Sequence, residues 1–304
     1  MSATRRAVLH GVLAGAALMM PLRVQAKAGE VPVRRIPSSG EVIPPVGLGT
    51  WITFNVGDDP ELRGECAAVM QAFFEMGGRM IDSSPMYGSS QAVVGDGLRK
   101  LGHSPALFAA DKVWISSGTR GPSQIEESRR LWGVPRFDLL QVHNLLSWDE
   151  HLKTLFAMKT AGQLRYVGIT TSEGRRHDLF EDIMRRQPLD FVQLTYNIVD
   201  RDVEQRILPL AADRGMGVIV NRPFQQGVLL RRLSGHPLPS WAADIGVSNW
   251  AQFVLKFIIS HPAVTVAIPA TSQVAHVREN MAAMAGPMPD AAMRRRMADH
   301  VRDL

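Results

Sequence analysis

Cysteine is almost absent from this sequence, because Cys66 is the only one among its 304 residues. A single thiol excludes an intrachain disulfide, so the fold cannot depend on oxidising surroundings. Cys66 lies within a helical pattern, and we expect it to be a small buried hydrophobic residue. The composition, with 45% hydrophobic and 21% charged residues, is that of a globular chain that can bury a large core.

A strong excess of charge is also missing. The formal net charge is +5, but three of the arginines lie in the first 26 residues, which contain no acidic residue. Without this segment the chain carries a net charge of +2. So small an excess does not indicate contact with a phosphate backbone, and we expect no nucleic acid partner.

The N-terminus lacks an apolar run long enough to cross a membrane. Its apolar stretch covers residues 11–20, which is half of the about 20 residues that a spanning helix needs. A membrane anchor is therefore a weaker interpretation of this segment than a cleaved export signal, and we expect no stable membrane insertion.

Residues 1–26 have the order of parts found in a signal peptide. Arg5 and Arg6 come first, the apolar stretch follows, and a site of small residues ends at Ala26. The paired arginines resemble a twin-arginine signal, which exports proteins that are already folded. The sequence thus predicts passage through the twin-arginine translocase to the periplasm of a bacterium, by a route that suits an enzyme loaded with its cofactor in the cytoplasm.

No G-x-G-x-x-G motif follows an early strand, which argues against a doubly wound dinucleotide-binding sheet. Short apolar runs instead alternate with helical patterns, as in repeated βα units with a parallel sheet. Eight such units over about 260 residues predict one (β/α)8 TIM barrel, with a doubly wound open sheet as the alternative. The predicted strands cover residues 46–50, 79–82, 107–113, 138–142, 166–170, 190–195, 216–220 and 264–268.

No internal repeat, low-complexity tract or linker interrupts the chain after the signal, so we expect residues 27–304 to form one domain. Residues 33–44, with the sequence VRRIPSSGEVIP, predict a hairpin across the bottom of the barrel. Residues 231–247 are rich in proline, glycine and tryptophan, and we interpret them as a long loop.

Four polar residues lie at or just after three adjacent predicted strands. Asp82 and Lys112 end the second and third strands, Tyr87 lies in the loop after the second, and His143 follows the fourth-strand run DLLQV. The carboxyl ends of barrel strands meet at one face, where the chemistry of this fold takes place. We therefore expect the four side chains to share one pocket.

These residue types suit carbonyl reduction. A buried lysine and aspartate are tolerable as a pair, and a nearby ammonium lowers the pKa of a phenol. Such a phenol, Tyr87, can give a proton to a developing alkoxide, while His143 donates a second hydrogen bond. Three of the four residues also have a plainer explanation: Asp82 in a turn, Lys112 on the surface and His143 in a structural role.

At these positions the chain resembles the aldo-keto reductase superfamily, and the resemblance extends over nearly all of it after the signal. The motifs occur in the order typical of that family. They are GLGTW at 47–51, IDSSPMYGSSQAVVGDGLR at 81–99, KVW at 112–114, QVHN at 141–144, VQLTYN at 192–197 and IPATSQVAHVRENMAA at 268–283. The resemblance implies a catalytic tetrad of Asp82, Tyr87, Lys112 and His143, in which Tyr87 is the general acid.

The resemblance also implies a nicotinamide cofactor extended across the barrel mouth, which delivers hydride to an aldehyde or ketone. Thr171 replaces an asparagine usual in the family, and Asn221 followed by Arg222 replaces its usual stacking aromatic ring. Trp51 and Trp114 match substrate-pocket positions. The cofactor-binding candidates are Thr50, Thr170, Gln193, Arg222, Thr271, His276, Arg278, Glu279 and Asn280.

The choice between the two nicotinamide nucleotides depends on the segment after the last strand. Ala270 and His276 stand where family members that favour the phosphorylated form hold a lysine and an arginine. Thr271 at a helix N-terminus, Arg222 and Arg278 offset this loss, because an arginine can grip a phosphate through two hydrogen bonds. We predict NADPH over NADH by a small margin, with NADH as the alternative cofactor.

Two other classes of function stay open. An exported sensor or accessory subunit would bind a nicotinamide nucleotide with little turnover, but it would have no need of a tuned phenol. A lyase or hydrolase of the same fold would leave Gln193, Glu279 and Asn280 without a purpose. We expect no metal, because the spacing of His143, His151 and His177 matches no ligand set.

Overall fold

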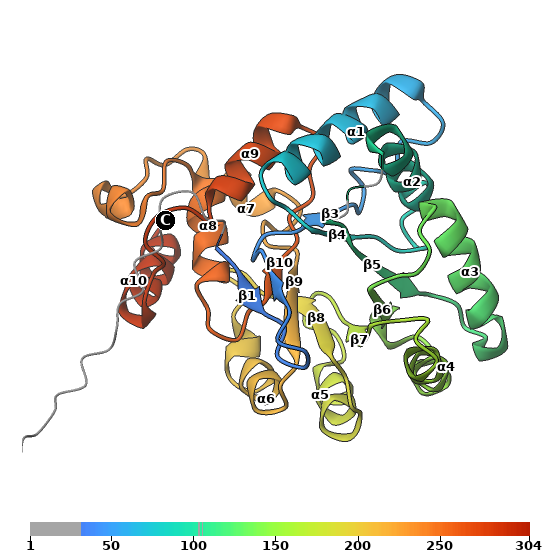
Figure 1. Ribbon diagram of the computed structural model, residues 1–304. Helices are drawn as coiled ribbons and strands as arrows, with labels where there is room; N and C mark the ends of the chain where they lie inside the picture. The colour runs from blue at the N-terminus through green and yellow to red at the C-terminus, as the bar shows by residue number, and fades with distance from the viewer. Residues whose placement is uncertain (1–31, 103, 105) are drawn as a thin grey trace, which may run out of the picture. The chain divides into compact units, whose positions relative to one another are not determined.

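The computed structural model describes residues 32–304 except 103 and 105. The predicted signal peptide, residues 1–26, lies outside the described residues. Eight parallel strands form one sheet, in the order β10-β9-β8-β7-β6-β5-β4-β3, as Figure 1 shows. They are β3 (Leu48–Gly49), β4 (Met80–Asp82), β5 (Phe108–Val113), β6 (Leu139–Val142), β7 (Tyr166–Thr170), β8 (Phe191–Thr195), β9 (Gly217–Asn221) and β10 (Val266–Ala267).

Backbone contacts bring the two ends of this sheet together. Parallel bridges join Val46 to Ala267 and Gly49 to Ala270, and the Gly49 amide donates to the Pro269 carbonyl at 3.0 Å. The sheet therefore closes on itself, which removes its exposed edges. The prediction of a (β/α)8 barrel is confirmed, and the doubly wound alternative is wrong.

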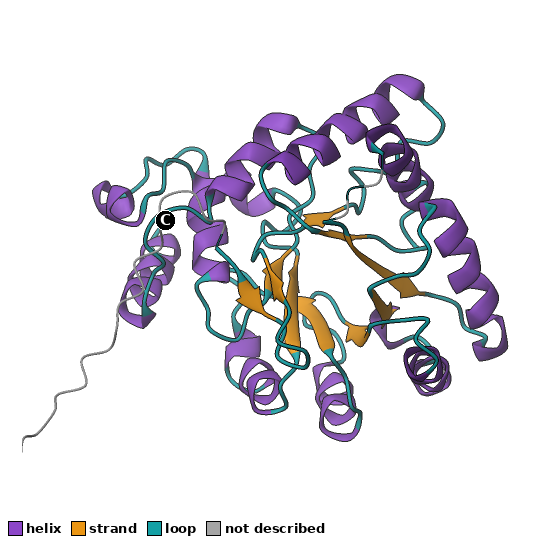
Figure 2. Cartoon of the chain, in the orientation of Figure 1, coloured by secondary structure: helices purple, strands orange, loops and turns teal. Residues whose placement is uncertain are grey.

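Helices cover the outside of the barrel, as Figure 2 shows. In the first of them, Asp59 caps the N-terminus by accepting from the Glu61 amide at 2.9 Å, and Cys66 is buried as expected. The helices are α1 (Pro60–Glu75), α2 (Ser90–Leu101), α3 (Gly121–Trp132), α4 (Trp148–Thr160), α5 (His177–Arg186), α6 (Ile207–Asp213), α7 (Val228–Leu233), α8 (Trp250–Ile259), α9 (Val274–Ala282) and α10 (Ala291–Arg302).

An antiparallel hairpin of β1 (Arg34–Arg35) and β2 (Val42–Ile43) covers the bottom of the barrel. Its Ile36 and Ile43 side chains are fully buried in a cluster with the first residues of β4, β5, β6, β7, β8 and β10. Because these are the amino-terminal residues of the strands, the hairpin closes the end opposite to the strand C-termini. The prediction of a hairpin at the bottom is confirmed.

Ion pairs connect this hairpin to the barrel. Arg165 donates to the Glu41 carboxylate of the hairpin and to Asp138 at 2.7 Å. The Tyr166 hydroxyl donates to Glu41 at 2.8 Å, and Arg79 donates to the Val42 carbonyl at 2.8 Å. Every strong donor named here has an acceptor, so the bottom of the barrel is held by satisfied polar contacts.

The segment 231–247 is more ordered than the predicted loop. It contains the end of α7 and the 3₁₀ helix η4 (Ser240–Ile245). The fully buried Lys256 of α8 donates to the Ile245 carbonyl at 2.6 Å and also to the Ala285 carbonyl. The bond to Ile245 holds the end of the segment from the helix that follows it, and Lys256 itself lies outside the segment. Within residues 32–304, apart from the two positions not described, we find no helix long and apolar enough to span a membrane.

Candidate active site

A cavity of about 120 Å³ opens at the carboxyl ends of the strands. Asp82 is the last residue of β4, and Lys112 is the next to last residue of β5. His143 directly follows β6, and Tyr87 lies in the loop between β4 and α2. Asp82, Tyr87 and His143 line the cavity, with the Lys112 ammonium 4.9 Å from the centre of the Tyr87 ring. The structure thus brings the four predicted catalytic residues together.

Asp82 and Lys112 form a buried ion pair, with exposed fractions of 1% and 0%. The Lys112 ammonium donates to Asp82 Oδ2 and to the Ser83 carbonyl at 2.8 Å. Asp82 Oδ1 accepts from Gln193 Nε2 at 2.9 Å and from Gln141 Nε2 at 3.2 Å. A buried pair is tolerated when such additional hydrogen bonds satisfy both partners.

The pKa of Tyr87 is raised above its ordinary value, which corrects the prediction of a lowered one. Burial of the phenol raises the pKa most, and the Lys112 ammonium lowers it by less. For Lys112, burial is the largest single influence and lowers the pKa, but the contributions of Asp82 and then Tyr87, taken together, outweigh it, so the pKa of Lys112 is raised. In this state Tyr87 is a protonated phenol and Lys112 a cation at neutral pH, so the phenol has a proton to donate.

His143 is buried beside the Tyr87 ring. Its pKa lies well below the ordinary value, because burial disfavours the charged form and the Lys112 ammonium repels a second positive charge. The imidazole is therefore neutral at physiological pH. Its Nδ1 lies 2.7 Å from the Ser84 hydroxyl oxygen, and its ring meets the Tyr87 ring edge-on at a centroid distance of 5.6 Å.

The two predicted pocket tryptophans differ in position. Trp51 lines the catalytic cavity, and its ring centroid lies 6.5 Å from that of Tyr87. Trp114 is 39% exposed and lies outside the residues that line this cavity, although its ring is 6.5 Å from the His143 ring. Trp51 thus forms part of the cavity wall, whereas Trp114 lies at its margin next to His143.

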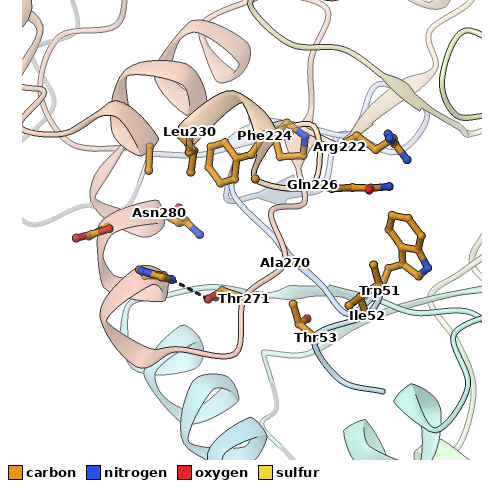
Figure 3. Close-up of a pocket in the computed structure, with 15 residues that line it drawn as sticks. Trp51, Ile52, Thr53, Arg222, Phe224, Gln226, Leu230, Ala270, Thr271 and Asn280 are labelled. Atoms are coloured by element: carbon orange, nitrogen blue, oxygen red, sulfur yellow. Dashed lines mark hydrogen bonds between the residues drawn. The ribbon is translucent and has the colours of Figure 1, made fainter. Parts of the chain in front are cut away.

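A second cavity of about 380 Å³ adjoins the first, and the two share Trp51, Arg222 and Ala270. Figure 3 shows its walls: Phe224 and Leu230 lie on one side, and Thr271 and Asn280 on another. His276 and Glu279 also line it, and His276 Nδ1 lies 3.3 Å from the Thr271 hydroxyl. With Arg222, five of the predicted cofactor residues therefore line this cavity, next to the predicted catalytic residues.

Three other predicted cofactor residues lie in the catalytic cavity. The Thr50 hydroxyl is 3.0 Å from the Asp82 carbonyl. The Thr170 hydroxyl oxygen accepts a hydrogen bond from the backbone N–H of Asn144 at 2.9 Å, so the hydroxyl proton is left to donate. Gln193 uses its amide nitrogen on Asp82, which leaves its oxygen to accept. One donor and one acceptor next to a larger cavity fit the carboxamide of a nicotinamide nucleotide.

Arg222 follows β9 and lines both cavities. Its backbone φ of 51° lies in the left-handed region, its side chain pairs with Glu173 at 2.9 Å, and its guanidinium lies 5.8 Å from the Trp51 ring. Asn221 lines the catalytic cavity but uses its amide on Thr195 and Thr171. Arg222, rather than Asn221, is thus the polar group at this edge that can meet a ligand.

Arg278 and Thr171 lie elsewhere. Arg278 is outside the lining residues of both cavities, and it pairs with Glu75 at 3.7 Å in a 57% exposed position. Thr171 donates its hydroxyl to the Arg175 carbonyl of its own loop. Thr171 is thus outside the residues that line the catalytic cavity.

Sequence reasoning missed several residues that the structure places in or beside these cavities. Ser84 contacts His143, and Gln141 contacts Asp82. Gln141 is two residues before His143, so the two-residue period of a strand could have placed both on the inner face. Phe224 and Gln226 of the larger cavity come from a loop, where no period helps. In the part of the chain that the structure describes, no cluster of His, Cys, Asp and Glu forms a metal site.

Residues 45–298 match the model of the aldo/keto reductase family. Two relatives from Escherichia coli are a methylglyoxal reductase, YeaE, and an NADH-specific methylglyoxal reductase. The first is 27% identical and the second 26%; the alignments cover 83% and 70% of this chain and 89% and 73% of the relatives.

Solved structures with the same fold include an aldo/keto reductase from Klebsiella pneumoniae in complex with NADP and acetate, and an aldo-keto reductase from Bacillus halodurans. Both superpose with a TM-score of 0.73, at 23% and 21% identity. They cover 86% and 90% of this chain and 93% and 96% of those chains. Since the family model spans most of the chain, this protein belongs to the aldo/keto reductase family.

Proposed function

We propose that this protein reduces an aldehyde or ketone to an alcohol with a reduced nicotinamide nucleotide, and that Tyr87 is the general acid. The observation that supports this most is the catalytic cavity itself. Tyr87 and His143 line it together with Asp82, and Asp82 forms a buried ion pair with Lys112, whose ammonium lies next to the Tyr87 ring. A protein that only binds a nucleotide has no use for this buried charge pair beside a phenol.

The residues divide the work as follows. A bound reduced nicotinamide nucleotide supplies the hydride. Tyr87 gives its proton to the carbonyl oxygen, and the Lys112 ammonium at the ring stabilises the phenolate that remains. Neutral His143 orients the same oxygen through a hydrogen bond. Asp82 keeps Lys112 charged and in position.

Two measurements test this function. Fluorescence titration with NADPH tests nucleotide binding, and the loss of NADPH absorbance in the presence of an aldehyde tests turnover. Methylglyoxal is the first substrate to test, because two relatives are named methylglyoxal reductases. Binding without turnover over a broad set of aldehydes and ketones would favour a sensor or accessory subunit, and no binding at all would contradict both functions.

For the nucleotide we propose NADPH over NADH by a small margin. Thr271 and His276 lie in the larger cavity, and the ion pair that Arg278 makes among the described residues is an exposed one with Glu75. Such exposed pairs contribute about 0–1 kcal/mol, so Arg278 is free to turn to a 2′-phosphate. Dissociation constants for the two nucleotides at one ionic strength test the order, and tighter binding of NADH would contradict it.

We also propose that the protein is exported folded through the twin-arginine translocase and acts in the periplasm, with residues 1–26 removed. The supporting observation is the order of Arg5 and Arg6, the apolar stretch and Ala26. Replacing Arg5 and Arg6 with lysine should retain the protein in the cytoplasm, as cell fractionation would show. Normal export of that variant would contradict this route.

A further inference from the structure

The Ser84 hydroxyl has no part in the mechanism above, although it is fully buried and contacts His143, which lines the catalytic cavity. It lies in the loop after β4, where its oxygen is 2.7 Å from Nδ1 of His143. The same oxygen accepts a hydrogen bond from the Met86 amide at 3.1 Å. Among the residues that the structure describes, the Ser84 hydroxyl has two hydrogen-bond partners, the His143 ring and the Met86 backbone amide.

The direction of the bond between Ser84 and His143 follows from these two contacts. The Met86 N–H can only donate, so it occupies a lone pair of the Ser84 oxygen. The hydroxyl proton then has one acceptor in reach, which is Nδ1 of His143. If Nδ1 donated instead, the hydroxyl proton would be buried without a partner, and this is costly. Ser84 therefore donates, and Nδ1 accepts.

This direction decides which ring nitrogen of His143 carries hydrogen. The imidazole is neutral, because burial and the Lys112 charge keep its pKa well below the ordinary value. A neutral imidazole has one N–H, so an accepting Nδ1 places the hydrogen on Nε2. With Nδ1 engaged by Ser84, Nε2 is the nitrogen left to meet a ligand in the cavity that His143 lines.

We propose that Ser84 is a positioning residue, which holds His143 in the Nε2–H tautomer so that this N–H donates to the carbonyl oxygen of the substrate. The proposal rests on the proposed carbonyl reduction. The opposite tautomer would present a lone pair to that oxygen and repel it. The hydrogen bond also resists a half-turn of the ring, since that turn would place a carbon atom against the Ser84 hydroxyl.

The tautomer can be measured without cofactor or substrate. Long-range ¹H–¹⁵N spectra of the histidine-labelled full chain distinguish protonated from unprotonated ring nitrogens, and the signals lost in His143→Ala identify this ring. We expect a protonated Nε2 and an unprotonated Nδ1 near neutral pH in the wild type. In Ser84→Ala we expect signals averaged over ring flips or over both tautomers. A protonated Nδ1 in the wild type would overturn the proposal.

A double-mutant cycle then tests the link to catalysis. Ser84→Ala should lower kcat/KM for a ketone about 10- to 100-fold, as when one donor to a developing oxyanion is weakened. The dissociation constant of NADPH should not change. In a His143→Ala background, Ser84→Ala should have no further effect, because Ser84 acts through His143. An equal loss in both backgrounds would show that Ser84 only supports the fold, and would overturn the proposal.

Ser128→Ala is the matched control. Ser128 is a buried serine that accepts from Gln91 at 2.9 Å, outside both cavities. Its loss should cost stability without changing the His143 signals or kcat. Since the spectra need no turnover, a failure of the proposed reduction remains distinguishable from a failure of the Ser84 proposal.

Discussion

At the bottom of the barrel, the Arg165 guanidinium meets two carboxylates, Glu41 and Asp138, and all three side chains are partly exposed. At the top, the Lys112 ammonium meets one carboxylate, Asp82, and both are buried. The backbone conformation also differs between the two ends of the barrel. Non-glycine residues with positive φ, such as Asn144 and Arg222 among those described, lie in loops after strands at the top.

This difference indicates that the two ends have different tasks. Partly exposed charges with several partners tolerate the loss of one contact, and they hold the hairpin on the barrel. A buried pair of one cation and one anion does not tolerate the loss of either partner, because the remaining charge is left buried and unpaired. This pair lies at the end of the barrel where the bonds of a substrate would change. Strained backbone at the same end is consistent with a site that is shaped for a ligand. The top should therefore respond to mutation in rate, and the bottom in stability.

Two tyrosines give the sharpest test of this comparison. Tyr87→Phe at the top should fold and bind NADPH but lose about 10²- to 10⁴-fold in kcat, because it removes the general acid. Tyr166→Phe at the bottom removes a hydroxyl bonded to Ser39 and Glu41, and should lower the free energy of unfolding by about 1 kcal/mol without changing kcat. Steady-state rates and urea unfolding measure both, and wild-type rates in Tyr87→Phe would refute its role.

Replacing the two cations, Lys112 at the top and Arg165 at the bottom, should likewise have different effects. Lys112→Met leaves the Asp82 carboxylate buried without its cation, which costs about 3–5 kcal/mol of the free energy of unfolding. It should also lower kcat at least about 10²-fold, by raising the pKa of Tyr87 further. Arg165→Met should cost about 1 kcal/mol, because the carboxylates it leaves are partly exposed.

The double variant Asp82→Asn, Lys112→Met serves as the control for the buried charge. It should recover most of the lost stability but none of the activity, since the unpaired charge is gone while the phenol is still without its cation. If the two single variants at Lys112 and Arg165 cost the same in urea unfolding, the contrast between the ends of the barrel would be wrong.

Asp111 extends the comparison to pH. It is fully buried next to Lys112 in the chain, and it accepts from the Lys112 amide and from Gln91, both at 2.7 Å. Burial raises its pKa to about 7. Because the folded pKa lies above the unfolded one, this group binds an additional proton in the folded state between pH 3.8 and about 7. Its contribution to stability is thus complete at low pH and is lost as the pH rises through about 7.

In Asp111→Asn this loss should disappear. The free energy of unfolding of the variant, relative to wild type, should therefore rise with pH by up to about 1.4 kcal/mol for each pH unit until the pH passes about 7. Asp138→Asn at the bottom is the control, since it removes an acceptor of Arg165 and should destabilise the protein throughout. Urea unfolding at several pH values measures both. A constant difference between Asp111→Asn and wild type would contradict this account of Asp111.

The smallest expected effect concerns Arg278. Arg278→Ala should weaken NADPH binding about 10-fold and leave NADH binding unchanged, if the side chain leaves Glu75 to contact the 2′-phosphate. Arg302→Ala, at a 70% exposed arginine that pairs with Asp299 and Asp303 of the C-terminal segment, is the control. Equal losses for both nucleotides in Arg278→Ala would indicate a general effect of charge instead of recognition of one phosphate.

Much of the fold could be predicted, because it depends on local patterns. Each predicted strand overlaps an observed one, since apolar runs between helical patterns mark buried parallel strands. The structure of the segment 231–247 could not be predicted in the same way, because it is held by Lys256, which lies outside the segment in the sequence. The catalytic candidates could be predicted from the sequence for a related reason. Once the barrel is known, residues at the carboxyl ends of its strands must lie on one face.

The amino-acid sequence by itself determined the barrel, the hairpin below it and the set of polar residues above it, because periodicity and strand-end position are properties of short segments. Only the tertiary structure decided how these residues interact. The contact of Ser84 with His143 spans 59 positions, and that of Gln193 with Asp82 spans 111. The direction of the Tyr87 pKa shift also depended on the fold, because burial and the Lys112 charge act in opposite senses and their balance is set by how deeply the phenol is enclosed.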